Sequence, residues 1–186
     1  RPSLHSAIAW GPGPSGAARL YWTGTTAGGG GVRVAIAYSD DLGASWSKLH
    51  VVRGTPAWVG GYPDITVDRD PGSPGYGLAY VAYNFPAPSG RGAGIRLLAS
   101  SDFGRTWRGT DVQRADVDRN FPVSWRFGSR VRTAPDGAVF VSTYQADLRT
   151  WDAADVFDRG GSANVGRIGF AVARLTFDRE ARSFSA

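Results

Sequence analysis

The chain has 186 residues without a cysteine, which excludes disulfide bonds, thiol catalysis and cysteine-ligated metal centres. Hydrophobic residues make up 42% of the sequence and glycine occupies 26 positions, so we expect a folded, turn-rich domain rather than a disordered segment. The basic residues behind the net charge of +5 are scattered, and no apolar stretch approaches the roughly 20 residues that span a bilayer, so neither nucleic acid nor a membrane is expected as a partner.

The first predicted elements are β-strands. Residues 6–10 and 20–23 are β-rich runs separated by a turn that contains glycine and proline. In residues 32–38 large apolar side chains alternate with smaller or polar ones, as expected for a strand with two different faces. The run that follows is turn-like, and we expect a hairpin there that leads into a fourth strand.

A turn motif occupies this hairpin and occurs twice. Residues 39–46 and residues 100–107 share the pattern Ser-x-Asp-x-Gly-x-Ser/Thr-Trp, and each copy follows a strand-like run. Serine and aspartate side chains can bond to the backbone of a tight turn, glycine tolerates a positive φ, and tryptophan returns the chain to the core. We therefore expect a structural role for the motif residues. They are Ser39, Asp41, Gly43, Trp46, Ser100, Asp102, Gly104 and Trp107.

The same order of predicted strands and turn occurs twice more along the chain. Strands are predicted at 64–67, 78–83 and 95–99, and again at 129–134, 139–144 and 168–174. In the third copy Asp178 matches the motif aspartate, but Glu180 replaces the glycine, so this turn is degenerate. The repeats divide the chain into three units, 1–56, 57–118 and 119–186.

Four antiparallel strands repeated about every 60 residues, with a hairpin motif between the third and fourth, are typical of propeller blades. The two motifs resemble the Asp-box, or bacterial neuraminidase repeat, of the sialidase superfamily, and residues 62–68 resemble an inner strand of its bacterial members. The resemblance implies one all-β domain over 1–186, a β-propeller of three four-stranded antiparallel blades that form half of a six-bladed sialidase-like ring. It also implies a secreted or cell-envelope protein.

Half a ring leaves two apolar blade faces uncovered. Either a missing part of the chain supplies the remaining blades, or two copies associate head to tail into a homodimer that closes a six-bladed ring. We favour the homodimer, because a stable chain that contained only half a ring would otherwise be insoluble.

The resemblance places the Asp-boxes on the face away from the ligand, so the loops of the opposite face are the candidate binding region. Trp58, Tyr62, Trp125 and Arg126 are predicted on loops between units, and the long loop 146–166 carries a polar cluster. Aromatic rings beside arginines and carboxylates suit a sugar, although loop packing and surface ion pairs explain the same residues. The candidate ligand-binding residues are Trp58, Tyr62, Trp125, Arg126, Arg149, Trp151, Asp152 and Asp155.

Catalytic residues cannot be assigned by this resemblance. A sialidase needs three arginines, an aspartate acid/base and a tyrosine nucleophile helped by a glutamate, but Glu180 is the only glutamate and lies in the degenerate turn. The Arg-Ile-Pro signature of the family is also absent, the nearest string being Arg167-Ile168-Gly169.

Three functions therefore remain open. The preferred one is a non-catalytic module that binds a glycan or a protein on its loop-rich face. The second is a sialidase-type glycoside hydrolase completed by a second copy or a missing segment, with carboxylates such as Asp152 and Asp155 as candidate acid/base groups. The third is a scaffold propeller. No cofactor and no metal are expected, because the calcium-like string 116–120 is followed by Phe121 where a glycine is needed.

Overall fold

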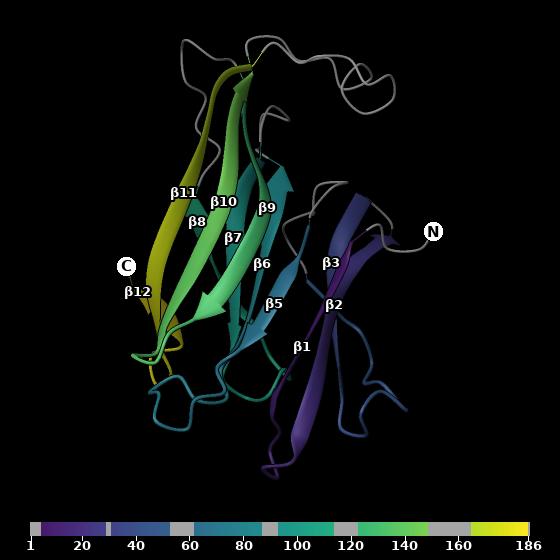
Figure 1. Ribbon diagram of the computed structural model, residues 1–186. Helices are drawn as coiled ribbons and strands as arrows, with labels where there is room; N and C mark the ends of the chain where they lie inside the picture. Colours follow the sequence, from purple (N-terminus) through teal and green to yellow (C-terminus); the bar gives the residue numbers. More distant parts are fainter. Residues whose placement is uncertain are drawn as a thin grey trace.

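The computed structural model describes residues 5–28, 31–52, 62–86, 93–113, 123–148 and 165–185. Within these ranges the chain forms strands and turns without a helix, so the described part contains no helix that is long and apolar enough to cross a membrane. The strands make three four-stranded antiparallel sheets (Figure 1). This confirms the predicted all-β fold of three four-stranded units. The predicted boundaries between units, near residues 56 and 118, lie outside the described residues.

Each sheet is a meander in which consecutive strands are neighbours. The first sheet contains β1 (Ser6–Pro12), β2 (Ala18–Gly28), β3 (Gly31–Ser39) and β4 (His50–Val51). The second sheet contains β5 (Asp64–Val67), β6 (Ala79–Pro86), β7 (Ala93–Ser100) and β8 (Arg108–Gln113). The third sheet contains β9 (Val123–Thr133), β10 (Ala138–Leu148), β11 (Val165–Asp178) and β12 (Ser183–Ser185).

One strand begins earlier than the sequence pattern predicted. We expected the first strand of the third unit at residue 129 and placed Trp125 and Arg126 on a loop, but β9 begins at Val123 and includes both. Trp125 is paired with Ala146 and Arg126 with Gln145, so the β9–β10 ladder continues past an irregularity between Ser142 and Tyr144. The loop assignment of Trp125 and Arg126 was therefore wrong, because the partner strand β10 is long enough to hold them in the sheet.

The three sheets lie side by side, with the first strand of each on a shared inner side (Figure 1). β1 contacts β5, and β5 contacts β9. One apolar cluster, which includes Tyr21 and Ile65, joins the first sheet to the second. Another cluster, which includes Leu97 and Val131, joins the second sheet to the third.

The second sheet is covered on both faces. Along β6, Val81 and Tyr83 belong to the cluster with the first sheet, whereas Tyr80 and Ala82 belong to the cluster with the third. Successive side chains of a strand point to opposite faces, so a strand between two apolar neighbours must be apolar at every position. This explains the nearly continuous apolar run that predicted β6.

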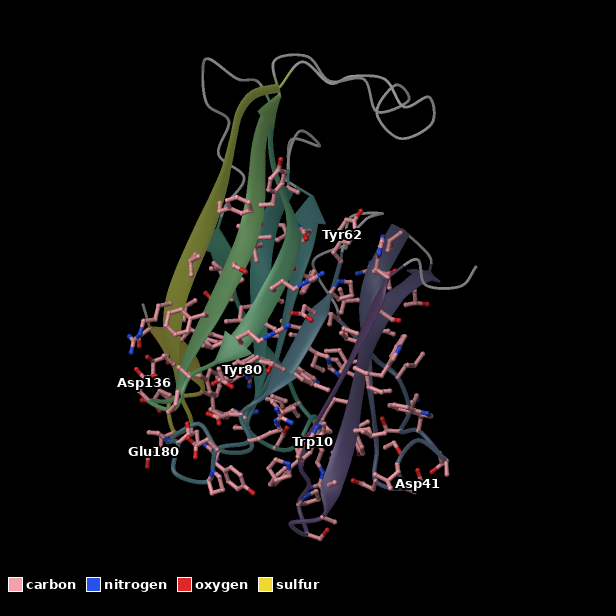
Figure 2. The ribbon with its side chains drawn as sticks, in the orientation of Figure 1. Trp10, Asp41, Tyr62, Tyr80, Asp136 and Glu180 are labelled. Carbon is pink, nitrogen blue, oxygen red and sulfur yellow. The ribbon has the colours of Figure 1, made fainter. Side chains whose placement is uncertain are left out.

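The sheets have two different ends. The ends of β2, β6 and β10 that precede residues 29–30, 87–92 and 149–164 lie at the top in Figure 1, which we call the loop end. The short turns, including those formed by the two motifs, lie at the bottom, which we call the turn end. Figure 2 shows Tyr62 toward the loop end, and Asp41, Asp136 and Glu180 at the turn end.

Candidate functional site

The two motif turns at the turn end have the same internal hydrogen bonds. In the first, Ser39 Oγ donates to Asp41 Oδ1 over 2.7 Å and accepts from the backbone N of Gly43 over 2.8 Å. Asp41 also accepts from the backbone N and the Oγ of Ser45, at 2.8 and 2.5 Å. Each oxygen of the carboxylate is therefore engaged inside the turn itself.

The second turn repeats this pattern atom for atom. Ser100 Oγ donates to Asp102 and accepts from Gly104 N, both over 2.8 Å, while Asp102 accepts from the N and Oγ1 of Thr106 at 2.8 and 2.5 Å. Gly104 has a φ of +84°, and a Cβ there would lie 3.0 Å from the ring of Tyr21 in the first sheet. The positive φ therefore favours glycine in the turn, and the close ring of Tyr21 leaves little room for a side chain.

These hydrogen bonds keep both aspartates ionised. The side chain and then the backbone of Ser45 lower the pKa of Asp41 to about 2. Burial raises the pKa of Asp102, but hydrogen bonds from Thr106 and Ser100 outweigh it, so this pKa also lies below the ordinary value. A carboxylate that is ionised and fully bonded is poorly suited to act as a general acid. The turns therefore offer structure rather than chemistry.

A buried arginine joins the two motif turns. Arg19, which is 2% exposed, holds Asp40 with Nε and Nη2 at 2.6 and 2.5 Å, and its Nη1 donates to the carbonyl oxygen of Phe103 in the second turn over 2.5 Å. Burial opposes the charge on Arg19, but the bonds to Asp40 prevail and its pKa is raised. The pattern of the motif did not include Arg19, because this residue comes from β2.

The third hairpin is built differently, in line with its degenerate sequence. Asp178 Oδ1 accepts from the backbone N of Glu180 and of Ala181, each over 2.8 Å. This carboxylate therefore caps its own turn instead of reaching four residues ahead as Asp41 and Asp102 do.

A cleft of about 590 Å³ lies at the loop end, between the first strands of the three sheets. We call it the inner-strand cleft. It is lined by His5, Ser6 and Ala7 at the start of β1, by Tyr62, Pro63 and Asp64 at the start of β5, and by Arg130 of β9. Because three separate strands contribute, the cleft exists only in the assembled fold.

Tyr62 lies in this cleft in a strained conformation. Its φ is +36°, which is unfavourable for a bulky L-residue, and its carbonyl oxygen accepts from Ser129 Oγ of β9 over 3.3 Å. The ring centroids of Tyr62 and His5 are 4.0 Å apart. Backbone strain of this kind is often found at ligand sites, where the surrounding structure maintains it.

Asp64 provides the carboxylate of the cleft. Its Oδ2 accepts from Val131 N over 3.0 Å and from Arg132 Nη1 over 2.8 Å, which ties β5 to β9. The Asp64 side chain is 12% exposed, whereas that of Arg132 is 65% exposed. Arg130, two residues before Arg132 on the same strand, lines the cleft and is exposed. Asp64 was not among the predicted site residues, although Tyr62 in the same string was, because the partners of Asp64 lie far along the chain.

The predicted ligand-binding residues can be placed only in part. Tyr62 lines the inner-strand cleft. Trp125 and Arg126 lie in β9, and the structure describes their backbone alone. The others lie outside the described residues, and their role stays a prediction. They are Trp58, Arg149, Trp151, Asp152 and Asp155.

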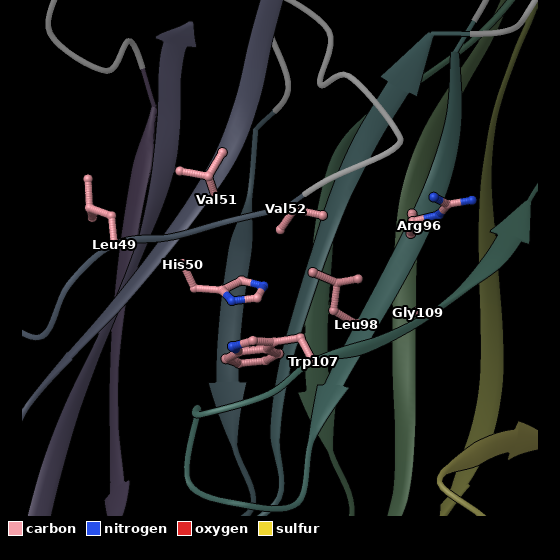
Figure 3. Close-up of a pocket in the computed structure, with 8 residues that line it drawn as sticks. All are labelled: Leu49, His50, Val51, Val52, Arg96, Leu98, Trp107 and Gly109. Atoms are coloured by element: carbon pink, nitrogen blue, oxygen red, sulfur yellow. The ribbon is translucent and has the colours of Figure 1, made fainter.

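A larger groove of about 760 Å³ lies elsewhere, between β4 and the second sheet, and we call it the outer groove (Figure 3). Its wall includes the rings of His50 and Trp107 and four aliphatic side chains, those of Leu49, Val51, Val52 and Leu98. The charged group there, Arg96, is paired with Asp111 at 2.6 Å. The inner-strand cleft, by contrast, is lined mainly by residues with polar side chains. Among the described residues, neither cleft gathers three side chains placed to hold a metal ion.

No family model and no curated protein matches the sequence. Solved structures with a similar fold do match. A Hadza microbial sialidase, Hz136, superposes with a TM-score of 0.50 at 17% identity, over 78% of this chain and 33% of its own. The Penicillium chrysogenum α-L-arabinanase complexed with arabinobiose superposes with a TM-score of 0.53 at 18% identity, over 77% of this chain and 41% of its own. Both neighbours are β-propeller glycoside hydrolases.

The fold is a β-propeller. The chain spans less than half the length of either neighbour, and at this identity the likeness shows the fold rather than an activity.

Proposed function

We propose that this β-propeller chain is a glycan-binding module that holds a sugar at the loop end, over the inner-strand cleft. The observation that carries the proposal is the meeting of the aromatic ring of Tyr62, the carboxylate of Asp64 and the guanidinium of Arg130 in one cleft. An aromatic ring can cover the apolar face of a sugar, while charged groups bond to its hydroxyls.

Two further points support a carbohydrate ligand. Both solved structures described above are glycan-active enzymes, and one of them is complexed with arabinobiose. The ring of Tyr62 packs against the ring of His5, with centroids 4.0 Å apart, and this contact helps to position the Tyr62 ring before a ligand arrives. We include Trp58, Trp151 and their predicted polar neighbours on the loops in the proposed binding face.

The described part of the cleft favours binding over catalysis. Glycoside hydrolases commonly use two carboxyl groups, one on each side of the scissile bond. Asp64 is the only carboxylate among the described residues that line the cleft, and its Oδ2 is already bonded to Val131 N and Arg132. A hydrolase would therefore need a second carboxylate, for which Asp152 and Asp155 are the candidates.

The test is the affinity of the chain for arabinobiose and for a sialic-acid-terminated trisaccharide, measured by titration calorimetry. We expect one of them to bind, and Tyr62→Ala to weaken it at least about tenfold, or about 1.4 kcal/mol. Tyr76→Ala is the matched control, since Tyr76 is a partly exposed tyrosine in a β5–β6 turn at the turn end and should leave affinity unchanged. Binding of neither sugar, or equal affinity in the two variants, would contradict the proposal.

The alternative function, a glycoside hydrolase of sialidase type, rests on the carboxylate of Asp64 and the guanidinium of Arg130 at the cleft. It predicts turnover of a fluorogenic sialoside or arabinoside that falls when Asp152→Asn or Asp155→Asn is introduced. Turnover with that dependence would replace the binding function by the hydrolase, whereas binding without turnover would support the module.

A further inference from the structure

Among the described residues, the first and the third sheet each have one face with apolar side chains that no other sheet covers. We call the face of a sheet that points along the chain order, toward the next sheet, its leading face, and the opposite face its trailing face. The second sheet uses both, as its trailing face packs on the first sheet and its leading face on the third. The open surfaces are therefore the trailing face of the first sheet and the leading face of the third.

Matched positions show what the open leading face lacks. Val34 and Ile36 of β3 and Ile95 and Leu97 of β7 lie on leading faces, where each packs on the next sheet. Phe170 and Val172 of β11 also lie on the leading face, because the alternate residues Ala173 and Leu175 pack toward the second sheet. Val34 and Ile95 are both 0% exposed, but Phe170 is 84% exposed. Ile36 and Leu97 are 2% and 0% exposed, but Val172 is 66% exposed.

The open trailing face gives the same result. Ile8, Ile65 and Val131 occupy one step of β1, β5 and β9, where Ile65 is 4% exposed, Val131 is 0% exposed and Ile8 is 61% exposed. The motif tryptophans agree, because Trp107 packs against the cluster between the first two sheets (Figure 3), whereas Trp46 is 43% exposed. Both open faces thus keep the apolar side chains of a buried junction.

The two open faces are the opposite halves of one type of junction. Within the chain, a leading face packs on a trailing face at two junctions, between the first and second sheets and between the second and third. The two uncovered faces are the trailing face of the first sheet and the leading face of the third. Propellers close with about four to eight blades, and the three described sheets of one copy together with the three of a second copy would give a ring of six. Large exposed apolar surfaces on soluble proteins commonly mark interaction sites.

We propose that two copies of this chain bind head to tail, the leading face of each third sheet packing on the trailing face of the partner's first sheet. The two junctions are then identical and related by a two-fold axis. Val172 of one copy takes the place that Leu97 has inside the chain, and Ile8 of the other takes that of Val131. Leu97 and Val131 belong to the same apolar cluster, so Val172 and Ile8 are expected to share a cluster in the dimer.

The test begins with the solution mass, measured by sedimentation equilibrium over a wide range of protein concentration. We expect a mass of two chains for the wild type, and a mass of one chain for Val172→Glu and for Ile8→Arg. Both substitutions are at exposed positions, so each variant should keep its strand content by circular dichroism. Tyr76→Glu, which changes a 40% exposed residue away from both faces, is the control and should remain a dimer.

Mixing the two charged variants tests the head-to-tail arrangement itself. In a mixed dimer one junction joins the two substituted faces, where the introduced carboxylate of one copy meets the introduced guanidinium of the other, and the second junction is native. An equimolar mixture of Val172→Glu and Ile8→Arg should therefore recover a mass of two chains. A folded wild type with the mass of one chain at every concentration, dimers of Val172→Glu, or a mixture that stays monomeric would each overturn the proposal.

Discussion

The second and third sheets are built from the same pattern of four strands but have different surroundings. Leu97 of β7 is fully buried where the second sheet packs on the third, whereas Val172, on the corresponding face of β11, is 66% exposed. Both positions are apolar, so the third sheet has the side chains of a covered sheet without the cover. The comparison teaches that this chain is patterned for neighbours on both sides of every sheet.

The largest expected difference between the two sheets concerns their apolar side chains. Leu97→Ala should lower the free energy of unfolding by about 2–5 kcal/mol, because a cavity opens in the cluster with the third sheet. Val172→Ala should change it by less than about 0.5 kcal/mol, as expected for a surface position. Both are measured by urea denaturation in the Ile8→Arg background, which keeps the open faces apart. Equal losses would mean that Val172 is already covered within one chain.

A second contrast concerns ion pairs, one between the two sheets and one on the third sheet alone. Asp64→Ala removes the acceptor of Val131 N and of Arg132, and should cost about 2–3 kcal/mol because a buried backbone N–H is left unpaired. Arg174→Ala breaks a solvent-exposed pair with Asp136 and should cost much less, because water screens such a pair. Thermal or urea unfolding of the two variants measures both values. A larger loss for Arg174→Ala would reverse the expected order.

A smaller effect is expected where the hairpins of the two sheets differ. Asp102→Ala removes the acceptor that Ser100 and Thr106 share in the second motif turn and should cost about 1–2 kcal/mol. Asp178→Ala removes a cap made with two backbone groups at an exposed turn and should cost less. Hydrogen exchange of the Gly104 amide, which donates to Ser100, should rise in Asp102→Ala and stay unchanged in Asp178→Ala.

The smallest effect is a dependence on pH in the first motif turn. The folded pKa of Asp41 is about 2, below its ordinary value of 3.8, so the contribution of its ionised form is complete above about pH 4 and is lost as the pH falls toward 2. The carboxyl carbon of Asp41, followed by NMR, should titrate with a midpoint near 2. Ser45→Ala should move that midpoint upward, because it removes the hydroxyl whose hydrogen bond is the largest cause of the low pKa and leaves the backbone bond in place. An unchanged midpoint would contradict this cause.

The motif turns and most strands were predicted from patterns within a few residues of the sequence. The spacing from Ser39 to Trp46 contains every partner that its turn needs, so the hydrogen bonds of Asp41 follow from the motif itself. The strands were recognised because alternation within a few residues reports which side chains share a face. The additional ladder pairs at Trp125 and Arg126 were missed, since strand length depends on the partner strand β10 rather than on β9 alone.

The sequence by itself thus determined the three repeated sheets, the two motif turns and the apolar faces, because each depends on contacts between near neighbours in the chain. Only the tertiary structure decided that Asp64 meets Val131, 67 residues away, and that Tyr62, Asp64 and Arg130 line one cleft. It also decided that Leu97 is buried while Val172 is exposed. The reason is that burial and long-range pairing depend on which sheets pack together, and no local pattern records where a stack of sheets ends.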